Sequence, residues 1–202
     1  RLIREKQPRL YEYVYTHRKK DAVAKLLNLR THEPVLHVSS MYSMEKNSIA
    51  MVMPVCQHPV NKNGVIVYDL SIEPDQFIMS DVDEIAGSIF TPASELPENV
   101  SRIPLKTVHL NKCPVIVPLK TMDEDTAERL NINVSRNQQH RDALLKHIDS
   151  LEQKTRQVFS QQDFPAVTDP DAQLYSGGFF SNSDYSRMQR IQHSTPDELA
   201  KL

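Results

Sequence analysis

The stretch Ile49-Ala-Met-Val-Met-Pro-Val55 and the stretch Val65-Ile-Val-Tyr-Asp-Leu-Ser71, which follows it closely, decide the fold class of this chain. Both are rich in Val, Ile and other apolar residues, and the turn-forming residues Asn61-Lys-Asn-Gly64 stand between them. Short apolar runs bounded by turn residues are typical of β-strands. We therefore predict a strand in each stretch.

Three further strands are predicted, one before these two stretches in the sequence and two after them. From Pro34 onward the apolar residues recur with a period of two, and the candidate segments are residues 35–39, 103–110 and 115–118. Several short strands with turn residues between them favour a small barrel or sandwich.

Apolar residues at helical spacing flank this β-unit. Residues 8–28 are predicted to be helical, with a break near Lys19-Lys20-Asp21, and residues 135–159 are predicted to form one long helix. Residues 161–180 are expected to be a loop, because they contain Pro165, Asp169-Pro170 and Gly177-Gly178. The succession of helix, small β-unit and long helix predicts an α+β fold.

Two short helices are expected inside the β-unit and after it. Ser80 with Asp83 is the predicted cap of a helix that runs through Ile89, and Thr121 is the predicted cap of a helix that runs through Leu130.

Both ends of the chain suggest a piece of a longer protein. Residues 1–6 have the pattern of the end of a helix already under way. Thr195, Pro196 and Glu198 have the pattern of a helix that has just begun.

Length and composition limit the classes of protein to which this chain can belong. At 202 residues the chain is long enough for one core and part of a second. No apolar run approaches the roughly 18 residues of a membrane span, and no signal-peptide pattern opens the chain, so no membrane partner is expected. Two cysteines are too few for the disulfide framework of a secreted scaffold in a chain of this length. We therefore expect a cytoplasmic location.

The net charge of −2 hides a segregation of charge along the chain. Residues 1–46 contain ten Lys or Arg against five acids, residues 63–101 contain eight acids and no Lys or Arg, and residues 102–122 contain four Lys or Arg and no acid. Because a polyanion responds to the local potential, two basic stretches can form a binding surface. Uneven charge on an ordinary solvated surface is the alternative interpretation.

The residues that carry catalytic chemistry in other proteins do not form a site here. Cys56, His58, Cys113, His109 and His37 lack the ligand spacing of a zinc site, and Pro114 beside Cys113 gives no helix N-terminus to activate the thiol. The acids of residues 69–98 are expected to lie on a solvated face, and no glycine-rich phosphate loop is present.

Three motifs point to binding instead. They are Tyr15-Thr-His-Arg-Lys-Lys20, Val108-His-Leu-Asn-Lys-Cys-Pro114 and Asp171-Ala-Gln-Leu-Tyr-Ser-Gly-Gly-Phe-Phe180. Cationic and hydrogen-bonding side chains among aromatics and turn formers suit a surface that binds a charged, stacked polymer. With Gln7-Pro-Arg-Leu10 and His37-Val-Ser39, these motifs resemble bacterial exonuclease I, the single-strand-specific 3′→5′ DNA exonuclease, over nearly the whole chain.

The resemblance implies a division into domains. Residues 1–28 would be the trailing helix and connector of the nuclease domain, residues 29–160 a small SH3-like β-barrel with inserted and flanking helices, and residues 161–202 the start of the C-terminal helical domain. The acidic two-metal site of the family, and the Mg²⁺ expected for the parent enzyme, belong to upstream motifs that this sequence lacks. We therefore assign no catalytic residue, metal ligand or cofactor within the chain.

The resemblance also implies a path for single-stranded DNA. The matching residues are Lys20, Asn63, Lys106 and Asn111, and the third motif adds Gln173 and Tyr175. Lysines suit phosphates, asparagines reach backbone or base edges, and a base can stack on the Tyr175 ring. The alternative for Tyr175 is an aromatic cluster with Phe179 and Phe180 that packs domains together.

The family docks the acidic, hydrophobic C-terminal tail of single-stranded DNA-binding protein (SSB) beside this domain. Tyr13 matches one docking position, Lys146 falls near another, and Arg136 is their expected neighbour. Asp123 stands where the best-studied form carries an arginine, so tail binding is expected to be weaker here, with Lys120 as the substitute cation.

A second class of function stays open: a small-barrel protein-interaction module with no nucleic-acid role. Strongly salt-dependent affinity for oligo-dT is expected for the DNA-binding fragment and not for this module.

Overall fold

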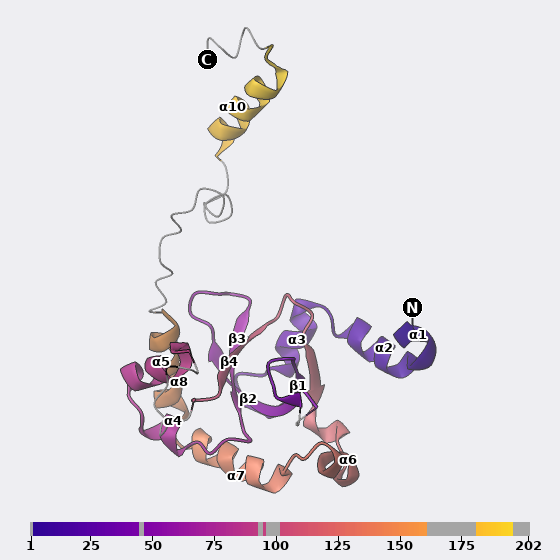
Figure 1. The fold of residues 1–202 in the computed structure, drawn as a ribbon, viewed down its shortest axis with the longest axis vertical. Helices are drawn as coiled ribbons and strands as arrows, with labels where there is room; N and C mark the ends of the chain where they lie inside the picture. Colours follow the sequence, from indigo (N-terminus) through magenta and orange to yellow (C-terminus); the bar gives the residue numbers. More distant parts are fainter. Residues whose placement is uncertain (1, 45–46, 93–94, 96–101, 161–180, 196–202) are drawn as a thin grey trace. The chain divides into compact units, whose positions relative to one another are not determined.

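An antiparallel sheet of five strands forms the centre of the fold (Figure 1). The strands are β1 (Val35–Val38), β2 (Ile49–Gln57), β3 (Gly64–Asp69), β4 (Leu105–His109) and β5 (Val115–Pro118), in the spatial order β4-β3-β2-β1-β5. The computed structural model describes residues 2–44, 47–92, 95, 102–160 and 181–195. All five predicted strands are confirmed, although β2 runs on to Gln57 and β4 is shorter than predicted.

The sheet is buried on both faces, because apolar side chains alternate between two cores. On β3, Ile66 and Tyr68 belong to the first core, while Val65 and Val67 belong to the second. Successive side chains of a strand point to opposite faces, so a strand covered on both sides is apolar at nearly every position. Burial on both faces of the sheet therefore explains why the apolar runs in the sequence are unbroken.

A bulge in β2 interrupts the alternation. The register with β3 shifts between Pro54 and Cys56, which leaves Val55 as the extra residue. Proline has no N–H for the ladder, and within a sheet it is tolerated at bulges. The Pro54 carbonyl accepts a hydrogen bond from Nδ1 of the buried His32, at 2.8 Å. The segment that precedes β1 is thereby fixed to the middle of β2.

Helices α4 (Asp75–Met79), α5 (Val82–Phe90), α7 (Val134–Leu145) and α8 (Ile148–Ser160) contribute to the first core. Their buried side chains in this core are Phe77, Ile85, Leu144, Leu151 and Val158. The α8 helix packs against both α5 and β2.

The second core is covered by α3 (Lys20–Leu26), through Val23, and by Leu27, which follows that helix. Two helices precede it, α1 (Leu2–Lys6) and α2 (Pro8–Thr16), so the predicted break before Lys20 is confirmed. The Tyr13 hydroxyl of α2 donates to the Ile116 carbonyl of β5 at 2.6 Å, which links α2 to the edge of the sheet.

The prediction of one long helix over residues 135–159 is wrong. The helix ends at Leu145 and a second begins at Ile148, with the N–H groups of Lys146 and His147 both donating to the Leu144 carbonyl. No Pro or Gly marks the break. In Figure 1 α7 and α8 run in different directions, so α7 can contact the segment before β1 while α8 covers β2.

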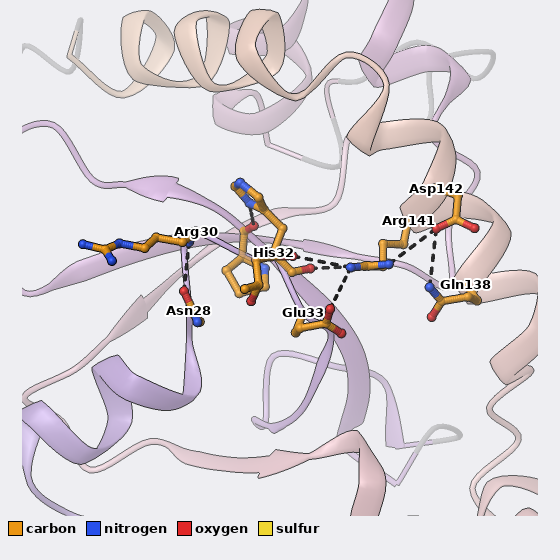
Figure 2. Close-up of polar contacts among 9 residues, drawn as sticks. Asn28, Arg30, His32, Glu33, Gln138, Arg141 and Asp142 are labelled. Carbon is orange, nitrogen blue, oxygen red and sulfur yellow. Dashed lines mark hydrogen bonds and ion pairs between the residues drawn. The ribbon is translucent and has the colours of Figure 1, made fainter.

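Figure 2 shows the contact that fixes α7 to the segment before β1. The Arg141 guanidinium pairs with the Glu33 carboxylate at 3.0 Å and reaches the carbonyls of Thr31 and His32 at 3.4 Å. Asp142 lies 3.5 Å from Arg141 on its other side. A side chain on α7 therefore holds the chain segment that leads from α3 into the sheet.

Two predicted helix caps are also wrong by a few residues. Asp81, not Ser80, caps α5, and its side chain forms a capping box with Glu84. The helix α6 (Glu124–Arg129) is capped by Asp123 rather than Thr121, which lies in the short 3₁₀ turn Leu119–Thr121. Aspartate is as strong a cap as Ser or Thr, so several adjacent candidates compete in such sequences.

The chain divides into two compact units, residues 1–162 and residues 163–202. In the second unit the structure describes α10 (Asn182–His193), which begins with a capping box between Ser181 and Asp184. The predicted loop over residues 161–180 and the predicted helix after Thr195 lie outside the described residues. None of the described helices has the length and apolarity to cross a membrane.

A buried histidine stands on the second-core face of β1. Nδ1 of His37 lies 2.9 Å from the Tyr42 hydroxyl, and Nζ of Lys106 lies 3.7 Å from the centroid of the Tyr42 ring. Burial, with a smaller contribution from the Lys106 charge, lowers the pKa of His37 to about 4. The folded protein therefore holds this imidazole neutral.

We expect His37 to make the fold sensitive to acid. The unfolded chain binds a proton at this residue near its ordinary pKa of 6.5, whereas the folded chain binds it only near 4, so the stabilisation is complete above pH 6.5 and is lost as the pH falls toward 4. The loss is at most about 3 kcal/mol. Urea unfolding across this pH range measures it: the His37→Gln variant should have a flatter profile than the wild type.

The control is His147→Gln, which removes an exposed histidine and should leave the wild-type profile unchanged. Equal pH dependence in the wild type and in His37→Gln would contradict the expected role of His37.

Candidate nucleic-acid interface

Two turns meet at one end of the sheet and bring two predicted DNA-binding asparagines together. The β2–β3 turn contains Asn63, and the turn after β4 contains Asn111. The Leu110 N–H donates to the Asn63 carbonyl at 2.8 Å, and the Asn61 side-chain amide lies 3.2 Å from Nδ1 of His109. Asn63 and Asn111, distant in the sequence, thus lie on two turns that are hydrogen-bonded to each other.

Asn61 organises this pair of turns. Its side-chain oxygen accepts from the Asn63 N–H at 2.9 Å, and its carbonyl accepts from the Gly64 N–H at 2.8 Å. A Cβ atom at Gly64 would stand 2.9 Å from both His58 and Thr107 side-chain carbons, so only glycine fits there. No role was predicted for Asn61, although its place in the Asn-Lys-Asn-Gly turn is a pattern that marks such residues.

The two histidines at these turns carry little positive charge at neutral pH. Burial lowers the pKa of His58 and of His109, and neighbouring charge at His109 and Lys112 lowers them further. Nδ1 of His58 accepts hydrogen bonds from the N–H groups of Val60 and Asn61. The end of the sheet therefore offers amide and imidazole groups beside two exposed lysines, Lys62 and Lys112.

Lys106 lies on β4, before the turn that holds Asn111. Its ammonium donates to the Met41 carbonyl at 2.9 Å and stands over the Tyr42 ring. This lysine therefore anchors the segment between β1 and β2 as well as placing a positive charge on the second-core face.

Lys20 is the first residue of α3 and is exposed. Its helix covers the second core, which is the face of the sheet where Lys106 lies. Gln173 and Tyr175 lie outside the described residues, and so do Phe179 and Phe180.

The three residues predicted for the partner tail lie on different parts of the fold. Tyr13 is half-buried on α2, where its hydroxyl contacts β5, its ring stacks on His17 at 4.2 Å, and burial raises its pKa. Arg136 and Lys146 stand at opposite ends of α7, about 15 Å apart along the helix axis. Among the described residues no hydrogen bond, ion pair or ring contact joins Tyr13 to either cation.

Arg136 lines a cavity of about 230 Å³ between the α6–α7 connection and the start of β2. Ile49, Leu130 and Ile132 contribute apolar atoms to this cavity, but most of its lining is polar, with Asn131, Asn133 and the buried Asn137 beside Arg136. A cavity that combines one guanidinium and several amides with a few apolar side chains can accept a carboxylate and part of the apolar group attached to it.

Asp123 has a structural task at the N-terminus of α6. Its carboxylate accepts a hydrogen bond from the Thr126 N–H at 2.8 Å, and the bonds from Thr126 lower the pKa of this carboxyl. Replacing Asp123 by arginine would therefore remove a helix cap together with the negative charge.

The cysteine and histidine residues that were considered for metal or nucleophilic chemistry are not gathered into one site. Burial raises the pKa of Cys56 to about 12, which makes its thiol unreactive, whereas Cys113 is exposed. Within the described part of the chain, no group of three or more His, Cys, Asp or Glu could hold a metal ion.

Comparison with known proteins matches two family models to this chain. The exonuclease I SH3-like domain matches residues 18–161, and the exonuclease I C-terminal domain matches residues 168–202. The predicted SH3-like β-domain is thereby confirmed.

Whole relatives give the same result. Exodeoxyribonuclease I of Haemophilus influenzae is 35% identical over all of this chain, which spans 42% of that protein. The solved exonuclease I of Methylocaldum szegediense is 42% identical, with a TM-score of 0.85 over 99% of this chain and 41% of its own.

Two further solved structures contain ligands or partners. Escherichia coli exonuclease I in complex with a dA16 oligonucleotide is 32% identical, with a TM-score of 0.87 over 100% of this chain and 42% of its own. A structure of SSB/exonuclease I in complex with an inhibitor is 31% identical, with a TM-score of 0.80 over 100% and 41%. Because one family model covers most of the chain and full-length relatives align with all of it, the chain belongs to the exonuclease I family.

Proposed function

We propose that this chain is the single-stranded-DNA-binding, non-catalytic part of a 3′→5′ exodeoxyribonuclease I that acts in DNA repair in the bacterial cytoplasm. On this proposal residues 1–28 are the connector from a nuclease domain, residues 29–160 the SH3-like domain, and residues 161–202 the start of the helical domain. The observation that carries the proposal is the pairing of the Asn63 and Asn111 turns through the bond between the Leu110 N–H and the Asn63 carbonyl. The E. coli relative solved with dA16 gives the same substrate class.

In this proposal the lysine side chains and the asparagine side chains have different roles. Lys20 and Lys106 hold phosphates, which gives affinity without sequence preference. Asn63 and Asn111 contact the backbone or base edges at the end of the sheet, and Gln173 and Tyr175 extend the path.

The parent enzyme would need Mg²⁺ for phosphodiester hydrolysis, with several carboxylates around the ions. The described residues of this chain offer no such group, so they do not fit the metal. The chain's contribution is to hold the strand, and no step of hydrolysis is assigned to its residues.

We further propose that the chain docks the acidic C-terminal tail of SSB. The cavity beside Arg136 would receive the terminal aromatic ring with its carboxylate, while Lys146 would hold acids further along the tail. An extended peptide covers the roughly 15 Å between these cations with about five residues. A relative solved as an SSB/exonuclease I complex supports the choice of partner. Tyr13 would contribute through a separate contact on α2.

A protein-interaction module without a nucleic-acid role is the competing function. It would use the same Arg136 cavity but would give the Asn63 and Asn111 turns no ligand.

Labelled oligo-dT should bind the 202-residue chain with an affinity that falls steeply as salt rises. Lys20→Ala should weaken binding evenly across sequences and should reduce the slope of log affinity against log salt by about 0.7, the share of one phosphate on a single strand. Fluorescence anisotropy at several salt concentrations measures both quantities. Lys106→Ala should reduce the slope as well, with a further loss of affinity because the Met41 segment is released.

Arg129→Ala, which removes an exposed cation on α6, is the matched control and should keep the wild-type slope. The oligonucleotide should also remain intact when Mg²⁺ is added. No binding by the wild-type chain at low salt would exclude the DNA-binding proposal and leave the interaction module.

A labelled peptide with an acidic run and a terminal phenylalanine should bind with an affinity that weakens as salt rises. Arg136→Ala should weaken this binding, because the cavity loses its only guanidinium among the described lining residues. Asp123→Asn should strengthen it modestly, since asparagine keeps the cap of α6 and removes a negative charge. Anisotropy of the peptide gives the affinities.

Arg156→Ala, on the α8 surface, is the control and should bind the peptide as the wild type does. If Arg136→Ala and Lys146→Ala both retain wild-type affinity, the tail does not run along α7.

A further inference from the structure

A groove that was not predicted runs between α3 and the sheet. It has a volume of about 480 Å³ and is lined by residues from the end of α3, the segment after it, and strands β2 and β3. Leu27, Val65 and Leu110 give it an apolar floor, and Lys25 and Arg30 lie at its rim. We call it the α3 groove.

The two rim cations are exposed and available. Among the interactions of the described residues, none engages the Lys25 ammonium or the Arg30 guanidinium; the Arg30 contact with Asn28 is made by its backbone N–H. Figure 2 shows the Arg30 side chain extending away from His32 and Glu33. No carboxylate is among the described residues that line the groove.

The groove continues into the paired turns at the end of the sheet. Leu110, part of its floor, donates its N–H to the Asn63 carbonyl. Gln57, also in its lining, donates its side-chain amide to the carbonyls of Gly64 at 2.7 Å and Lys62 at 3.2 Å. The residues that shape the groove are therefore those that hold the β2–β3 turn.

We propose that the α3 groove binds single-stranded DNA, with Lys25 and Arg30 on phosphates and a base against the exposed apolar atoms of the groove lining. This inference rests on the proposed DNA-binding function and adds two cations and a base-contacting surface to its path. A route on which exposed cations stand beside uncharged amides, with no carboxylate among the described residues that line the groove, matches a strand whose charged backbone alternates with uncharged bases. An acidic peptide would match the cations but would leave the amide-rich turns without a ligand.

Ala24 offers a sharp test, because it is exposed on α3 and lines the groove. Ala24→Glu and Ala24→Gln add side chains of the same size that both suit a helix, and they differ by one charge. We expect Ala24→Glu to weaken oligo-dT binding several-fold at low salt, with the loss vanishing at high salt, and Ala24→Gln to bind nearly as the wild type does.

The rim cations give a second measurement. Lys25→Ala and Arg30→Ala should each reduce the salt slope of oligo-dT binding by about 0.7, and the double variant by about 1.4. Arg129→Ala, an exposed cation on α6, should leave the slope unchanged. Circular dichroism should show all six variants folded, because every altered side chain is exposed.

The outcomes separate this inference from the function on which it rests. If Lys20→Ala weakens binding while Ala24→Glu, Lys25→Ala and Arg30→Ala all match their controls, the groove is not on the path and the DNA-binding function stands. If the wild type binds the acidic peptide in a manner that Ala24→Glu abolishes, while oligo-dT binding is unaffected, the groove is a peptide site and the inference is overturned. Absence of any oligo-dT binding would exclude the function and the groove together.

Discussion

The antiparallel pairing of β2 with β3 is the constraint on which the rest of the structure depends. These two central strands are buried on both faces, so the sheet must be covered twice, once by α4, α5, α7 and α8 and once by α3 with the segment around Tyr42. Each face contributes a stack of apolar side chains, and burial of such side chains stabilises a protein by about 1.5–3 kcal/mol apiece. Little of the sheet surface is left for ligands.

The residues proposed to bind DNA consequently lie where the two-sided cover stops. The turn before β3 and the turn after β4 lie at the edge of this cover, and there hydrogen bonds of the Asn61 and His109 side chains and of the Asn63 backbone hold the chain in place. The α3 groove arises for a related reason: a helix of seven residues covers only part of the second-core face, and a groove is left beside it. The sites proposed for this domain therefore lie at the edges of its two apolar cores.

The strands could be predicted from the sequence because a two-sided core demands apolar residues at every position, which is a strong local pattern. The break between α7 and α8 could not, since no Pro or Gly causes it and the apolar spacing continues through Lys146 and His147. The caps were misplaced because Ser80 and Asp81 are adjacent candidates of similar strength, and only the backbone geometry selects between them. The resemblance to a known family predicted Asn63 and Asn111 as DNA-binding residues, but the α3 groove depends on how α3 packs on the second-core face of the sheet, which no short motif encodes.

Lys106 shows that a residue matching a DNA-path position of the family can also have a structural role. Its ammonium is bound to the Met41 carbonyl and to the face of the Tyr42 ring, and Tyr42 in turn contacts the buried His37. A lysine held in this way has already given up part of its conformational freedom, so a phosphate that reaches it orders less of the side chain than a phosphate that reaches the exposed Lys20. Removing Lys106 therefore changes the protein before any DNA is added, whereas Lys20, Lys25 and Arg30 lie outside such a network. Substitutions of these exposed cations therefore test the proposed DNA path more directly than substitution of Lys106 does.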